Sequence, residues 1–452
     1  MNDSKDLTYL LVSAFVDGND IVPVKITVMS YKESSVNEKI HMIITLPEIE
    51  NAGIIDDISQ LNGTVSTPPA TIVSLSDFLG KIKMKIEGLR GVFCVGAGRQ
   101  NAENDNNVWQ KRRNKMKALF IGGTGTISMA ITEQLAKNED WDLYLLNRGN
   151  RSGEVPEGVH QIVVDINDEA AVAEILKDQY FDVVGEFIGF ETDQIERDIR
   201  LFKGKTGQYI YISSASAYDK PCKDYRITEG TTLANKYWQY SRNKIACEEL
   251  LMKEYRENGF PVTIVRPSHT YDVRNVPMGV HGKKGSYQVI KRMMEGKPII
   301  VHGDGTSLWT MTFNEDFAKG YIGLMANRHA IGEAFQITCD ETLTWNQIFE
   351  TIADALGVEY KPYYVASSFL AEVSDYDLYG GLLGDKSNSV VFDNTKLKKA
   401  VPGFAPCIRF EQGIKKTLDY IKDHPECQVL DPEFDDWCDR VINALEEAKK
   451  KI

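Results

Sequence analysis

The chain has 452 residues, 42% of them hydrophobic, which is enough for two or more domains with buried cores. The net charge of −13 argues against a nucleic-acid-binding surface. The sequence contains no apolar run of about 18 residues and no signal-peptide pattern at its start. We therefore expect a cytoplasmic protein without a membrane-spanning helix.

The cysteines and histidines give no pattern of metal ligands. The seven cysteines are scattered and never form Cys-x-x-Cys, so free thiols in a reducing compartment are expected. His281 and His302 lack carboxylate or histidine partners at ligand spacing. We predict neither a disulfide framework nor a metal site.

The first part of the chain is predicted to form a small β-rich or α+β module. Residues 7–48 alternate between apolar and polar, with turn-forming sequences at Asp17–Asp20 and near Asn37. A strand and a helix capped by Ser76 or Asp77 are expected next. We assign residues 1–97 to an accessory module of unknown function and residues 98–115, which include a polar Asn-rich stretch, to a linker.

A different pattern begins at Met116, where apolar strands alternate with amphipathic helices. Such alternation predicts a parallel sheet covered by helices on both faces. We therefore expect an α/β fold: a doubly wound Rossmann-type domain over 116–278, interleaved with a mixed substrate-binding lobe and C-terminal helices over 279–452. The predicted strands lie at 118–122, 142–147, 160–165, 182–189, 208–214 and 262–267.

The sequence "GGTGTIS" at residues 122–128 follows the first of these strands and precedes a predicted helix. Gly122 and Gly125 would permit a sharp turn and close approach of a ligand to the backbone. The amides at Thr126 and Ile127, where the helix starts, could then bind a pyrophosphate. A plain strand-to-helix turn also uses glycine, so this loop alone is weak evidence.

The ends of the next two strands concern the rest of the cofactor. Asn147 and Arg148 stand where an NAD-binding domain usually has an acidic residue, and a guanidinium can pair with a 2′-phosphate. This favours NADP over the alternative, NAD; the other interpretation of Arg148 is an exposed surface residue. Asp165, followed by Ile166, is placed to accept a hydrogen bond from adenine, or else to form a turn or helix cap.

Three residues predict proton-transfer chemistry. Tyr240 and Lys244 are four residues apart, so they share one face of a helix, and a nearby ammonium can lower the pKa of a phenol. Tyr240 would then act as general acid and base. Ser214, at the end of an apolar strand, could hydrogen-bond the same substrate oxygen.

Together, "GGTGTIS", "NRG", "VVDIND", "SSASAY", "YSRNK" and "VRPSHTY" make the chain resemble the extended short-chain dehydrogenase/reductases, specifically the NAD(P)-dependent epimerase/dehydratase family, from Met116 to about Tyr420. The resemblance implies a bound nicotinamide cofactor and a Ser214–Tyr240–Lys244 triad. It also implies that Lys244 reaches the cofactor ribose and that Phe187 and Pro267 lie along the cofactor.

The substrate side departs from the family pattern. Trp309 stands where members acting on nucleotide sugars often have a diphosphate-binding arginine, so Arg274 or Lys283 would have to supply the charge. Trp309 could pack on a sugar ring or within the core. Ser216 and His269 are further candidates for contact with the substrate, with His269 either a general base or a structural residue.

We expect an enzyme of the oxidoreductase, epimerase or dehydratase type, acting on a sugar-like or other small hydroxyl or carbonyl substrate. The alternative is a non-catalytic nucleotide-sensing or RNA-associated protein, because the missing arginine and "NRG" are also similar to an atypical subgroup that includes plastid RNA-binding proteins. The substrate's identity and the oligomeric state stay open, with a homodimer as one option.

Overall fold

The computed structural model describes residues 6–16, 20–34, 37–45, 54–55 and 115–452. The chain divides into two compact units, Met1–Lys111 and Arg112–Ile452.

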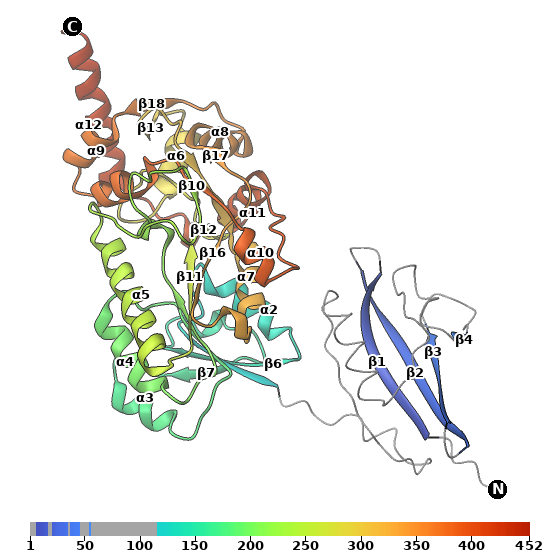
Figure 1. Cartoon of the computed structure of the whole chain (residues 1–452). Helices are drawn as coiled ribbons and strands as arrows, with labels where there is room; N and C mark the ends of the chain where they lie inside the picture. Colours follow the sequence, from blue (N-terminus) through green and yellow to red (C-terminus); the bar gives the residue numbers. More distant parts are fainter. Residues whose placement is uncertain (1–5, 17–19, 35–36, 46–53, 56–114) are drawn as a thin grey trace. The chain divides into compact units, whose positions relative to one another are not determined.

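The first unit contains a four-stranded antiparallel sheet in the order β1-β2-β3-β4 (Figure 1). Adjacent strands pair antiparallel on either side of the two predicted turns. The predicted helix capped by Ser76 or Asp77 and the predicted linker lie outside the described residues. The strands are β1 (Asp6–Val16), β2 (Asp20–Ser34), β3 (Asn37–Thr45) and β4 (Ile54–Ile55).

The second unit is built on a seven-stranded parallel sheet in the order β16-β11-β9-β8-β5-β6-β7. The chain runs outward from β5 to β7 and then restarts at β8 on the other side of β5. In open parallel sheets, ligands bind outside the carboxyl ends of the strands at such a reversal. The strands are β5 (Met116–Ile121), β6 (Trp141–Asn147), β7 (His160–Val163), β8 (Val183–Glu186), β9 (Tyr209–Ile212), β11 (Val262–Pro267) and β16 (Glu333–Ile337).

Strand β5 shows why helices cover both faces of this sheet. Its side chains alternate between two separate cores: Ala118 and Phe120 belong to one, Leu119 and Ile121 to the other. The first core includes residues of α2 (Ser128–Ala136), α7 (Asn314–Leu324) and α10 (Thr395–Ala400). The second includes residues of α3 (Glu169–Ile175), α4 (Thr192–Phe202) and α5 (Gln239–Asn258). The predicted doubly wound α/β fold is therefore confirmed.

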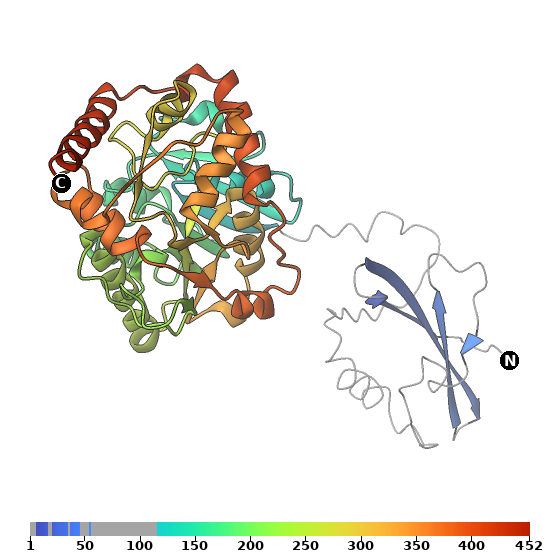
Figure 2. The same cartoon turned by 90° about the horizontal axis from the view of Figure 1, so that it is seen from above.

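The third core forms the smaller lobe, which lies above the sheet in Figure 1 and overlaps it in Figure 2, seen from above. Strand β16 comes from the predicted lobe region but pairs with β11, so the two parts interleave. No helix among the described residues is long and apolar enough to cross a membrane. The remaining elements are η2 (Ser152–Glu154), η3 (Ala215–Ala217), β10 (Arg226–Ile227), β12 (His269–Tyr271), α6 (Tyr287–Met294), β13 (Ile299–His302), β14 (Leu308–Trp309), β15 (Met311–Phe313), η4 (Arg328–Ala330), β17 (Leu343–Thr344), α8 (Trp345–Leu356), β18 (Pro362–Val365), α9 (Ser367–Glu372), η5 (Tyr379–Lys386), β19 (Val391–Phe392), α11 (Phe410–Asp423), η6 (Pro425–Cys427) and α12 (Pro432–Lys449).

Candidate active site

The glycine loop connects β5 to α2 at the point where the strand order reverses. Gly122 and Gly123 have φ values of +102° and +100°, which residues with a Cβ rarely adopt. The backbone amides of Thr126 and Ile127, just before α2, donate to no group in the described part of the chain. Free amides at a helix start suit a phosphate, so this loop fits the pyrophosphate of a dinucleotide.

We expect Gly123→Val to weaken dinucleotide binding and to destabilise the fold by about 1–3 kcal/mol, because its φ is strained for any L side chain. A Cβ at this position would also lie 2.6 Å from Leu145 Cδ2. Urea unfolding and titration with NAD and NADP measure the two effects. Gly153→Ala is the control, because a Cβ there meets nothing within 4 Å. Equal stability and affinity in both variants would contradict the role of the loop.

The end of β6 places a cation near this loop. Asn147 Oδ1 accepts a hydrogen bond from the Gly149 amide at 2.8 Å, which shapes the turn. Arg148 is exposed and has no ion-pair partner within the region that the structure describes. The neighbouring Arg151 donates through Nη1 to the Thr124 carbonyl at 2.9 Å, so a second guanidinium contacts the loop itself.

Asp165 is exposed after β7, and its Oδ1 accepts from the Asn167 amide at 2.9 Å. Asp168, rather than Asp165, caps α3, by accepting from the Ala171 amide at 3.1 Å. Asp165 therefore forms a turn, which is one of the roles predicted for it. Its second carboxylate oxygen has no partner in the described chain. Ile166 is buried in the core beside it.

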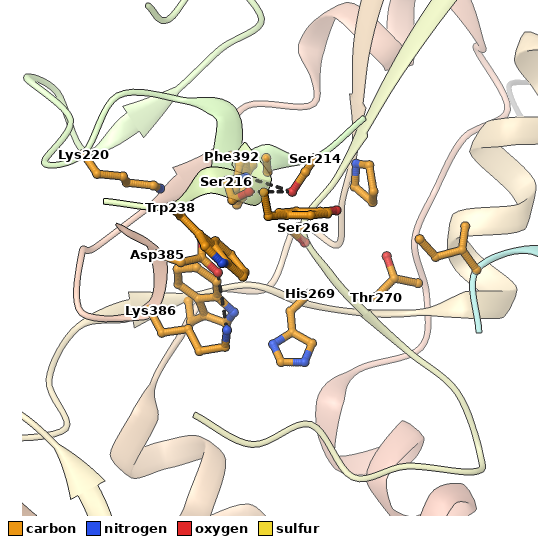
Figure 3. Close-up of a pocket in the computed structure, with 15 residues that line it drawn as sticks. Ser214, Ser216, Lys220, Trp238, Ser268, His269, Thr270, Asp385, Lys386 and Phe392 are labelled. Carbon is orange, nitrogen blue, oxygen red and sulfur yellow. Dashed lines mark hydrogen bonds and ion pairs between the residues drawn. The ribbon is translucent and has the colours of Figure 1, made fainter. Parts of the chain in front are cut away.

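A cavity of about 260 Å³ lies at the carboxyl ends of the central strands (Figure 3). Seven of the predicted site residues line it: Ile127, Ser214, Ser216, Tyr240, Pro267, His269 and Trp309. Residues from the glycine loop, two strand ends, α5 and the smaller lobe thus share one space. The cavity is also lined by residues that are not among those predicted: Ala215, Lys220, Trp238, Ser268, Thr270, Asp385, Lys386 and Phe392.

Tyr240 and Lys244 lie one turn apart on α5, as their spacing predicts. Tyr240 lines the cavity, whereas Lys244 is buried, with its ammonium 5.9 Å from the centre of the Tyr240 ring. The Lys244 ammonium donates to the carbonyls of Gly189 at 2.7 Å and Ile212 at 2.8 Å. These bonds fix the lysine between the ends of β8 and β9.

The electrostatics of this pair differ from the prediction. Burial raises the pKa of the Tyr240 phenol, and its interaction with Ser214 opposes that rise only in part. Burial also lowers the pKa of Lys244 to about 8. The expected lowering of the phenol pKa is therefore wrong, because desolvation and the charge of Asp385 outweigh the hydrogen bond with Ser214.

The two serines form a short hydrogen-bonded chain beside Tyr240. Ser214 Oγ and Ser216 Oγ are 2.8 Å apart, and Ser241 Oγ donates to Ser216 Oγ at 2.7 Å. Ser214 is half-buried and Ser216 is buried, so Ser214 is the better placed to reach a substrate oxygen. Ser216 orients Ser214 as well as lining the cavity.

His269 and Trp309 both line the cavity. Burial and the charge of Lys386 lower the pKa of His269 to about 3, so the imidazole is neutral near pH 7 and cannot donate a proton as imidazolium. Trp309 packs on Trp345 with ring centres 6.0 Å apart, and its Nε1 has no hydrogen-bond partner among the described residues. Trp309 thus belongs to the core and to the cavity wall at once.

The remaining predicted residues lie around this centre. Phe187 packs against Phe120 at 5.1 Å, below the glycine loop. Arg274 binds Asp272 through Nη2 at 2.5 Å and reaches Glu154 at 3.5 Å, so its charge is already compensated. Lys283 is exposed above the Tyr376 ring. Neither cation lines the cavity, and neither replaces the missing arginine there.

The reversed strand order and the glycine loop define a Rossmann-type fold, and the tyrosine–lysine helix adds a candidate proton-transfer site. Residues 118–338 match the model of the NAD dependent epimerase/dehydratase family.

Relatives with described activities differ from one another. The chain is 24% identical to a UDP-N-acetyl-alpha-D-glucosaminuronate decarboxylase from Bacillus cytotoxicus, over 68% of this chain and 98% of that one. It is also 24% identical to the chloroplast stem-loop binding protein of 41 kDa b from Arabidopsis thaliana, over 63% and 72%. The solved structure of a Bacillus cereus UDP-glucuronic acid 4-epimerase with UDP-glucuronic acid and NAD superposes with a TM-score of 0.55 at 21% identity, over 68% of this chain and 99% of that one. That structural likeness shows the fold.

Proposed function

We propose that this chain is an NAD(P)-dependent enzyme that epimerises, dehydrates or reduces a sugar-like substrate through hydride transfer, with Tyr240 as general acid and base. The observation that carries the proposal is the cavity in which Tyr240 and Ser214 meet beside the end of the glycine loop. Lys244 lies one helical turn from Tyr240, and hydrogen bonds to carbonyls at two strand ends hold it there.

Each residue at the site has a separate role in the proposed reaction. Tyr240 exchanges a proton with the hydroxyl or carbonyl oxygen of the substrate, and Ser214 hydrogen-bonds the same oxygen. Pro267 and the free amides after Gly125 would hold the dinucleotide, with Phe187 below the loop and Lys244 as the group that would reach its ribose. A bound nicotinamide supplies hydride acceptance and donation at the carbon that carries the oxygen. Desolvation disfavours the tyrosinate form of Tyr240, and the interaction with Ser214 opposes this effect.

The direct test is turnover by the full chain with nicotinamide cofactor and a set of nucleotide sugars, followed by NMR of the sugar and by the absorbance of reduced nicotinamide. Product formation that requires cofactor supports the proposal. A chain that neither binds a nicotinamide nucleotide nor converts any sugar in the set would contradict it.

NADP is the cofactor that we propose in preference to NAD. Arg148 is exposed and without an ion-pair partner in the described chain, and a guanidinium recognises a 2′-phosphate better than any neutral group. We expect Arg148→Glu to weaken NADP binding by about 10–100-fold and NAD binding by much less. Titration of both nucleotides into variant and wild type measures this. Arg256→Glu, at the exposed end of α5, is the charge-matched control, and equal losses for NADP and NAD would refute the assignment.

A non-catalytic, RNA-associated role is the second candidate, because the chain is similar to a chloroplast stem-loop binding protein. The net charge of −13 and the tyrosine–lysine pair in the cavity weigh against it. RNA binding at physiological salt by wild type, together with turnover that is absent throughout, would favour this second role.

A further inference from the structure

Lys220 is a cation that the cavity contains and the proposed reaction does not use. Only 2% of its surface is exposed, yet it lines the cavity. Figure 3 shows its side chain directed toward Ser216 and Trp238, on the side of the cavity that carries Ser214. The ammonium is therefore out of bulk water but open to whatever occupies the cavity.

The described part of the chain gives this ammonium no hydrogen-bond or ion-pair partner. The carboxylate on the cavity wall, Asp385, pairs with Lys386 at 3.4 Å instead. His269 adds no charge near pH 7, because burial and Lys386 keep it neutral. With Lys386 and Asp385 cancelling, the cavity carries about one uncompensated positive charge, at Lys220.

The described part of the protein covers almost all of this side chain and returns no hydrogen bond to its ammonium, so an anion in the cavity would be a favourable partner. We propose that Lys220 binds an anionic group, a carboxylate or phosphate, on the substrate. The proposal rests on the function proposed above and narrows its substrate class to acids.

The place of Lys220 in the cavity locates this anion. Lys220 lines the same cavity as Ser214 and Tyr240, so the anion would occupy the same space as the oxygen that these two residues would serve. A cavity of about 260 Å³ is small for a ligand pocket and suits one sugar-sized unit. The charge is therefore expected on the reacting unit, and the missing arginine at Trp309 leaves Lys220 as the recognition group on the substrate side.

The test compares two ligands that differ in one group. UDP-glucuronate and UDP-glucose are titrated into the full chain with NADP present, and binding is followed by tryptophan fluorescence, since Trp238 and Trp309 line the cavity. We expect wild type to bind UDP-glucuronate at least about tenfold more tightly. In Lys220→Met, which keeps length but removes charge, the preference falls to about twofold or less. Lys223→Met, at an exposed lysine nearby, keeps the wild-type preference.

Free D-glucuronate and inorganic phosphate separate the two sources of anion. Displacement by D-glucuronate that Lys220→Met abolishes assigns a carboxylate, and displacement by phosphate alone assigns a phosphate. The proposal is overturned if wild type binds the two nucleotide sugars equally and binds neither small anion. It is also overturned if the preference for UDP-glucuronate persists in Lys220→Met.

Stability gives a readout that a structural lysine would not show. Lys220→Met is expected to melt at or above the wild-type temperature, because no unpaired ammonium is buried; a clear drop in Tm would indicate a structural role and count against the proposal. If Lys220→Met does not fold, Lys220→Gln takes its place, and the wild-type affinities for UDP-glucuronate and UDP-glucose still test the proposal. A preference for the acidic sugar without turnover would support the anion site and contradict the proposed function. Turnover without that preference would support the proposed function and contradict the anion site.

Discussion

Replacing Tyr240 by phenylalanine is expected to lower kcat by about 10²–10⁴-fold, the usual contribution of a general acid or base. The ring would keep its packing against Trp238 at 5.0 Å and Phe190 at 6.2 Å, so folding and cofactor affinity should change little. Single-turnover kinetics with the absorbance of reduced nicotinamide, together with a cofactor titration, separate the two effects.

Tyr237→Phe is the matched control for this prediction. Tyr237 precedes α5, is half-buried and packs against Tyr379 at 5.8 Å, but it does not line the cavity. Removing its hydroxyl should leave kcat within about twofold of wild type. Equal kcat in wild type and Tyr240→Phe would show that another group transfers the proton.

The pH profile should identify the second ionisable partner. Burial lowers the pKa of Lys244 to about 8, so its ammonium is lost as the pH rises through that value. Its charge favours the tyrosinate that general base catalysis needs. Tyr240 and Lys244 thus act as a coupled pair, and their apparent pKa values belong to the pair in the loaded enzyme.

Sequence patterns predicted the central sheet well because each strand is buried on both faces. Strand β5 shows this: four successive apolar residues fill two cores, so its sequence is a continuous apolar run. The seventh strand, β16, was missed. It is five residues long, begins with the exposed Glu333 and pairs only with β11, so it carries little of that signal.

Some residues of the candidate site could likewise be predicted from the sequence, and others could not. Gly122, Ser214 and Tyr240 lie at strand ends or on a helix face, where local spacing fixes their position. Asp385 and Lys386 come from η5, a π-helical turn far along the chain, and no local period marks it. Lys220 was also missed, because burial without a partner is a property of the folded chain that residue type alone does not reveal.

The protein is expected to carry an acid-sensitive pair of histidines. Burial, more than any charge, lowers the pKa of His269 to about 3 and of His302 to about 4. The charge of Lys386 adds to this fall at His269, whereas at His302 the hydrogen bond with the Lys386 carbonyl opposes it. The unfolded chain takes up a proton on each near pH 6.5, whereas the folded chain does not. Their contribution to stability is thus fully present above about pH 6.5 and is lost as the pH falls toward the folded values.

This loss amounts to about 2 kcal/mol for each histidine, and about 4 kcal/mol for the pair, between about pH 7 and about pH 5. Burial raises the pKa of Glu186 and Glu229, which act in the opposite direction, so the variant must be compared with wild type. We expect the stability of His269→Gln to fall by about 2 kcal/mol less than that of wild type over this range. Urea unfolding at several pH values measures it, with His329→Gln, at an exposed histidine, as control. A parallel pH dependence of His269→Gln and wild type would mean that His269 takes up its proton in the folded protein, and His269 would then return as a candidate acid in the cavity.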